Sequence, residues 1–163
     1  MPHVVKVLIV WALILFVSRP GFAQGAASPF TPLVGSWSGA GTILLASGAK
    51  ERLRCVANNR FVGGTSDLRL ELSCESDSYK FQLRSQVSHR AGTIAGTWDE
   101  LTRATGGNVD GRVAGNQIRI RAEGQTFSAI LSLTTQTDRQ TVAIQSPGSE
   151  MSNVNIVLTR KAR

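Results

Sequence analysis

The chain is poor in the residue types that carry most enzymatic and metal chemistry. It has two histidines and two cysteines in 163 residues, and after residue 23 only His89 remains, in the turn-like stretch SHRAG. A Ser-His-Asp unit would have to be built around that one loop residue. One histidine and two cysteines also form no ligand cluster with the spacing of a metal site. We therefore expect no catalytic residue, no metal and no cofactor.

Long apolar runs are also missing, except for VLIVWALILFV at residues 7–17. This run is about half of the ~20 apolar residues that span a bilayer. It follows Lys6 and ends before the Arg-Pro pair at 19–20, with a small residue at Ala23. That order is typical of a cleaved secretory signal. We expect residues 1–23 to be a signal peptide and the protein to be periplasmic or secreted, without stable membrane insertion; an uncleaved anchor is the alternative.

Acidic residues are outnumbered. The chain has 18 Lys+Arg and 11 Asp+Glu, and loss of Lys6 and Arg19 with the signal peptide leaves 16 basic against 11 acidic residues, a net charge of +5. Such an excess favours anionic partners such as lipid headgroups, polysaccharide or acidic proteins. Aromatic residues make up 6% of the chain and do not alternate with the basic ones, so we expect no binding of nucleic acid.

Helix patterns are absent from the remaining chain, which instead shows short alternating apolar and polar runs between turn residues. We expect about ten strands at 35–45, 50–59, 66–74, 79–87, 92–100, 107–114, 117–122, 126–134, 140–146 and 152–160. Closing such a meander removes exposed sheet edges. The sequence therefore predicts an all-β, antiparallel up-and-down barrel of 8–10 strands as one domain at 35–163, after a flexible arm at 24–34; a sandwich is the alternative.

The alternation also predicts which residues face each other. Folding the chain about Gly64-Thr65 places Cys55 opposite Cys74 on the inward face. Across the next two turns the same alternation places Cys74 opposite Tyr79 and Leu83 opposite Trp98. Because export brings a chain into oxidising conditions, we predict a Cys55–Cys74 disulfide.

On the outward face, the expected register places Arg69 opposite Arg84, and Arg112 opposite Arg119. Like charges placed opposite one another destabilise a sheet, but such pairs can hold an anion. These four arginines are a candidate anion-binding surface, and a solvated face of mixed charge is the alternative.

One adjacent pair of acids, Asp99 and Glu100, could suggest acid–base chemistry. Neighbours on a strand point to opposite faces, so the two carboxyl groups would not act together. Glu100 follows Trp98 in the inward phase, and we interpret it as an ion-pair partner of Arg103 at the mouth of the barrel.

The stretch PLVGSWSGAG at 32–41 opens the first strand with Gly35-x-Trp37. This opening resembles the calycins, the group of lipocalins, fatty-acid-binding proteins and avidins. In that group an arginine of the last strand packs across the first-strand tryptophan, and Arg160 lies in the inward phase of the last strand. The resemblance implies a calycin-like barrel closed at one end by Trp37 and Arg160 through a cation–π contact.

Large and small residues mix on the inward face, which is compatible with either a filled core or a cavity. The candidate ligand-lining residues are Tyr79, Phe81, Trp98 and Phe127. We expect a non-catalytic binding protein that holds a small apolar or amphipathic ligand. The alternatives are a protein-interaction module, such as the calycin-like periplasmic inhibitors of secreted proteases with residues 24–33 as the inhibitory arm, and a binder of anionic envelope surfaces.

Overall fold

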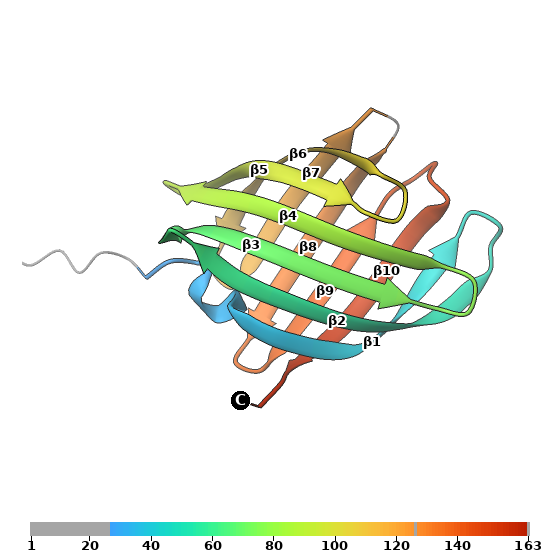
Figure 1. Ribbon diagram of the computed structural model, residues 1–163, viewed down its shortest axis with the longest axis horizontal. Coiled ribbons are helices and arrows are strands. Elements are labelled where there is room, and N and C mark those ends of the chain that lie inside the picture. The colour runs from blue at the N-terminus through green and yellow to red at the C-terminus, as the bar shows by residue number, and fades with distance from the viewer. Residues whose placement is uncertain (1–26, 126, 163) are drawn as a thin grey trace, which may run out of the picture.

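The computed structural model describes residues 27–125 and 127–162. After a 3-10 turn, η1 (Thr31–Leu33), the chain forms ten strands: β1 (Gly35–Leu45), β2 (Lys50–Val62), β3 (Gly64–Glu75), β4 (Lys80–Arg90), β5 (Thr93–Glu100), β6 (Thr105–Ala114), β7 (Gln117–Gly124), β8 (Ser128–Gln136), β9 (Arg139–Gln145) and β10 (Met151–Arg160). Each strand pairs with its neighbours in the chain, and β1 pairs with β10 (Figure 1). The predicted closed antiparallel barrel is confirmed.

The predicted signal peptide, residues 1–23, lies outside the described residues. Within the part of the chain that the structure describes, no helix has the length and apolar character needed to cross a bilayer.

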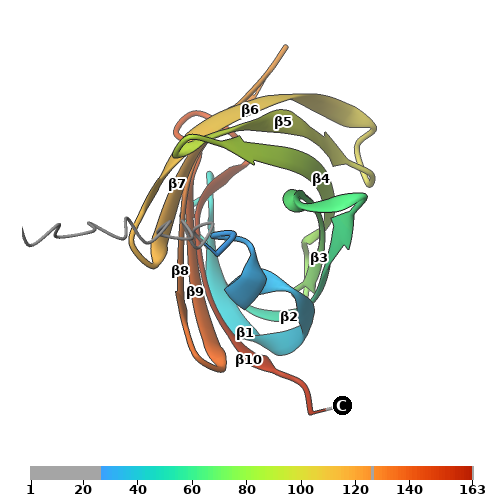
Figure 2. The same ribbon diagram turned by 90° about the vertical axis from the view of Figure 1, so that its left-hand side faces the viewer.

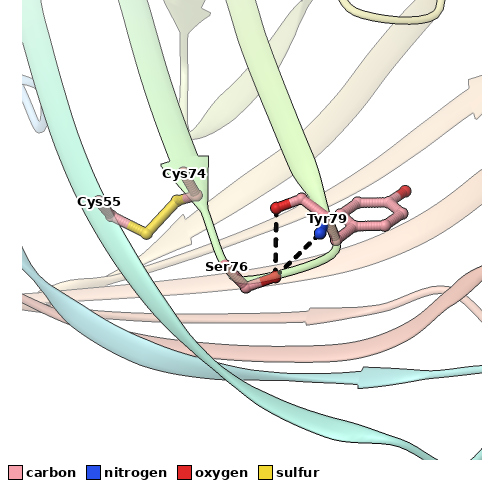
Figure 3. The surroundings of a disulfide bond; sticks show 4 residues. All are labelled: Cys55, Cys74, Ser76 and Tyr79. Atoms are coloured by element: carbon pink, nitrogen blue, oxygen red, sulfur yellow. Dashed lines mark hydrogen bonds between the residues drawn. A yellow bond between two sulfur atoms is a disulfide. The ribbon is translucent and has the colours of Figure 1, made fainter.

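The disulfide joins Cys55 on β2 to Cys74 on β3, with the two Cα atoms 4.2 Å apart (Figure 3). The two residues are direct cross-strand partners and both are buried, as the alternation predicts. In the chain-entropy model, a loop of this size stabilises the fold by about 3 kcal/mol. Disulfides persist in oxidising compartments, so this bond is compatible with export.

The β3–β4 hairpin begins directly after Cys74. The hydroxyl oxygen of Ser76 accepts from the backbone N–H of Tyr79 and lies equally close to the Tyr79 carbonyl oxygen, both at 3.2 Å (Figure 3). The Glu51 carboxylate accepts hydrogen bonds from Ser76 and Ser78, and these lower its pKa. Because these contacts hold residues 76–79 as a four-residue loop, Cys74 pairs with Phe81.

This pairing corrects the expected register by two residues, since the sequence alone suggested that Cys74 pairs with Tyr79. The β4–β5 hairpin differs in the same way: its turn is only Ala91-Gly92, so Trp98 lies opposite Ser85 instead of Leu83. A shift of two residues leaves every side chain on its predicted face. The inward and outward sets therefore survive, while the cross-strand partners change.

The barrel has two different ends. We call the end that carries η1, the turns β2–β3, β4–β5, β6–β7 and β8–β9 and the last residues of β10 the closed end. Figure 2, which faces this end, shows η1 within the outline of the barrel. The other end carries the turns β1–β2, β3–β4, β5–β6 and β9–β10 and the β7–β8 connection, and we call it the open end.

Candidate ligand cavity

Trp37 and Arg160 close one end of the barrel together with η1. Trp37 is fully buried, and the Arg160 guanidinium lies 4.1 Å from the centroid of its ring. The indole Nε1–H donates to the carbonyl of Leu33 at 2.9 Å. Arg160 donates to the carbonyls of Pro32 and Val34, the former at 2.8 Å. The carbonyls of residues 32–34, just before β1, thus all accept a hydrogen bond from a side chain. These bonds fix the segment to the barrel.

Gly35 permits this close approach. Its φ is +126°, and a Cβ at this position would lie 2.8 Å from Nη1 of Arg160. The backbone conformation therefore favours glycine, and a Cβ would also press on the guanidinium that holds Val34. Gly35 and Trp37, the two residues of the Gly-x-Trp opening, thus both lie against the Arg160 guanidinium.

Of the flexible arm expected at 24–34, the structure describes residues 27–34 and places them against the barrel. Phe30 and Leu33 are 1% and 2% exposed and pack among the core residues beside Leu68 and Trp98. Within the described part of the expected inhibitory arm at 24–33, these two side chains lie in the barrel interior and are not free to contact a protease.

A cavity of about 590 Å³ occupies the barrel above this plug. The core is divided into two clusters, one around Trp37 and Phe81 and the other around Phe30 and Trp98. Leu83, Phe127 and Leu131 contact both clusters and line the cavity. Inward leucines such as Leu131 are only half-buried because they border this space. The sequence left a filled core and a cavity open, and the structure has the cavity.

All four candidate ligand-lining residues line the cavity. Trp98 and Phe127 lie with ring centroids 5.3 Å apart, and Tyr79 and Phe81 with centroids 6.3 Å apart. The structure thus brings two aromatic pairs to one apolar chamber.

The open end carries a charged bridge centred on Arg103, in the β5–β6 turn. Its guanidinium stacks over the Tyr79 ring at 4.2 Å from the centroid and donates to the carbonyl of Lys80 at 3.1 Å. It lies 3.4 Å from a carboxylate oxygen of Glu100 and 3.5 Å from one of Glu150. The structure therefore contains the Glu100–Arg103 pair suggested by the sequence and extends it to Glu150 in the β9–β10 turn.

Glu100 anchors this bridge. Its carboxylate accepts hydrogen bonds from the backbone N–H groups of Gln82, Thr102 and Arg103. Burial alone would raise the pKa of this carboxyl, but the hydrogen bonds together lower it. Glu100 is therefore a fixed anion at neutral pH. Glu150, whose side chain is 69% exposed, is the partner of Arg103 that solvent reaches.

Tyr79 presents a neutral phenol beside the bridge. Burial raises its pKa, and the charge of Arg103 offsets only part of this effect. A neutral hydroxyl at the mouth can donate and accept hydrogen bonds without adding charge.

Two polar residues deeper in the cavity wall, Asn59 and Gln140, were missed by sequence reasoning. Asn59 donates to the carbonyl of Leu33 at 3.1 Å. Gln140 is 2% exposed, and its Nε2 has no hydrogen-bond partner among the described residues. Their position in the inward phase, two residues after Ala57 and two before Val142, was the signal that could have found them.

The four candidate anion-binding arginines do not form one site. Arg84 lies opposite Glu71 and pairs with its carboxylate at 3.7 Å, while Arg69 lies between Arg60 and Gln86. The expected Arg69–Arg84 pair is corrected because the β3–β4 loop spans 76–79 instead of 75–78, which moves every partner on β4 by two residues. Arg112 and Arg119 do lie directly opposite each other.

The remaining candidate for acid–base chemistry, His89, has a structural role. Its Nε2 accepts a hydrogen bond from the backbone of Gly92 at 3.1 Å, and its ring packs edge-on against Phe30. In the described residues, no group of three or more His, Cys, Asp or Glu side chains is arranged to hold a metal ion.

No family model matches this sequence, and no curated protein matches it significantly. Solved structures are similar in fold. The crystal structure of Rv2717c from M. tuberculosis aligns with a TM-score of 0.66 at 16% identity, covering 82% of this chain and 95% of that one. The S-type phycobiliprotein lyase CPES from Guillardia theta aligns with a TM-score of 0.60 at 10% identity, covering 82% and 91%. Both fit the calycin-like barrel implied by Gly35-x-Trp37 and Arg160.

Proposed function

We propose that this chain is an exported, non-catalytic binding protein that holds one small apolar or amphipathic molecule in its barrel. The observation that supports this most strongly is the cavity of about 590 Å³. Ligand pockets have volumes of about 300–1,000 Å³, apolar walls and a few polar groups that set orientation. This cavity has leucine, valine, isoleucine and aromatic walls, with polar groups near its two ends.

The ends of the cavity differ in a way that suits one molecule bound lengthwise. At the closed end, the plug of Trp37 and Arg160 blocks passage, and the Gln140 amide offers a donor that has no partner among the described residues. At the open end, access depends on the bridge from Arg103 to the exposed Glu150. A ligand with a long apolar body therefore enters between the open-end turns. The polar groups of the ligand stay near Tyr79 and Arg103, or the ligand offers a hydrogen-bond acceptor to Gln140.

Titration with N-phenyl-1-naphthylamine, an uncharged apolar dye that fluoresces in dry sites, tests this function. We expect saturable binding with one dye per chain, and displacement by medium-chain alcohols or acids. Dye fluorescence that rises without saturation, or that persists when an excess of such competitors is present, would contradict binding in the cavity.

A further inference from the structure

Charge is distributed unequally along the barrel axis. The charge of each end is taken over the four residues of every strand nearest that end and the adjoining turns, with residues 161–162 added to the closed end. The closed end then carries six arginines and Lys161 against Asp67 and Asp138, a net charge of +5. The open end, counted in the same way, carries five basic and seven acidic residues, a net charge of −2. The positive excess of the protein is thus concentrated where the cavity does not open.

Three of these arginines form a row across neighbouring strands. Arg90 on β4 pairs with Thr93 on β5, Thr93 pairs with Arg112 on β6, and Arg112 pairs with Arg119 on β7. Direct cross-strand partners share a face, and Arg90 and Arg119 are exposed. Strands lie about 4.8 Å apart, so the three charges fall within about 15 Å on the convex outer wall. We call Arg90, Arg112 and Arg119 the basic row.

The basic row is not neutralised within the protein. None of its members has an ion-pair partner among the described residues, and Arg119 donates only to the neutral Gln117 side chain, at 3.2 Å. At the open end, by contrast, Arg103 lies between two carboxylates and Arg121 pairs with Glu123 at 3.7 Å. Like charges held opposite one another at Arg112 and Arg119 destabilise the sheet, and an external anionic surface would relieve that repulsion.

We propose that the closed end faces an anionic lipid membrane through the basic row, so that the cavity mouth points away from the membrane. The position of the chain ends supports a membrane as the partner. The Ser28 hydroxyl donates a hydrogen bond to the carbonyl of Thr65, at the start of β3, at 2.6 Å. The chain therefore enters the barrel at the closed end. Only nine residues, 18–26, separate the described part from the apolar run 7–17. Nine residues reach at most about 30 Å. The closed end therefore lies near the bilayer for as long as that run is attached and inserted.

Vesicle co-sedimentation tests this orientation, with protein that its own leader has directed to export and that is then purified. We expect stronger binding to vesicles of phosphatidylcholine and phosphatidylglycerol in equal parts than to phosphatidylcholine alone. The difference should shrink as salt rises from 50 to 300 mM, because salt screens these contacts. Equal binding to both vesicles at low salt, or a difference that salt does not reduce, would overturn the proposal.

A matched pair of triple variants separates the basic row from net charge. Each basic residue near an anionic surface contributes about fivefold in partitioning, so R90Q/R112Q/R119Q is expected to weaken binding about a hundredfold. The variant K50Q/R52Q/K80Q has the same net charge but alters the open end, and it should stay within about threefold of wild type. Equal losses in the two variants would mean that overall charge, and not the closed end, directs binding. Circular dichroism and the thermal midpoint confirm that both variants fold.

Discussion

Replacing Leu131 with tryptophan is expected to weaken binding of N-phenyl-1-naphthylamine at least tenfold. Leu131 lies on β8, points inward, and contacts both core clusters where they border the cavity. Because its side chain is only half-buried, a larger group can extend into the empty volume without displacing packed neighbours. The indole then occupies space that the ligand needs. Fluorescence titration of purified wild type and variant measures the change.

The neighbouring residue provides the control. Ile130 points outward on the same strand and is 53% exposed, so Ile130→Trp adds the same side chain to the outer wall. We expect this variant to bind the dye as wild type does, with a similar thermal midpoint. Unchanged affinity in Leu131→Trp would show that the dye binds elsewhere. Equal loss in both variants would point to a general effect of the substitutions on β8.

Replacing Trp37 with alanine is expected to lower the free energy of unfolding by about 3–5 kcal/mol, the usual cost of removing a fully buried large aromatic side chain. The indole is completely buried, supports the Arg160 guanidinium, and donates to the carbonyl of Leu33. Its loss therefore leaves a cavity and also frees the plug at the closed end. Urea unfolding followed by circular dichroism gives the change.

Two further variants locate the source of that loss. Arg160→Met keeps an apolar stem but removes the donors to Pro32 and Val34, so we expect a smaller loss of about 1–3 kcal/mol. Val56→Ala removes an exposed apolar side chain of the outer wall and should change stability by less than about 0.5 kcal/mol. If Trp37→Ala were as mild as Val56→Ala, the closed end would not be the anchor that its contacts describe.

The faces of the strands could be predicted from the sequence, because alternation of apolar and polar residues directly encodes which side is buried. Cys55 and Cys74 illustrate this: both fall on the inward phase of adjacent strands, and they are bonded. The partners across β3–β4 could not be predicted equally well. Their register depends on where the hairpin loop begins, and the hydrogen bonds of Glu51 and Ser76 place this loop one residue later than the alternation suggests.

The cavity could not be predicted because its volume depends on the curvature of the barrel. At Gly96 a Cβ would lie 2.0 Å from the carbonyl oxygen of Gln86, so this glycine allows adjacent backbones to approach more closely than any other residue would. No alternation pattern reports such an approach. The Arg103–Glu150 bridge is likewise invisible in the sequence, since it joins two turns 47 positions apart.

The most direct test of ligand binding is native mass spectrometry of the protein, purified after its own leader has directed its export. Comparison with the denatured mass separates a bound molecule from a covalent change. We expect a stoichiometric extra mass that is lost on denaturation and that an excess of N-phenyl-1-naphthylamine replaces. A native mass equal to the denatured mass, which stays unchanged when the dye is added, would contradict a ligand-binding barrel.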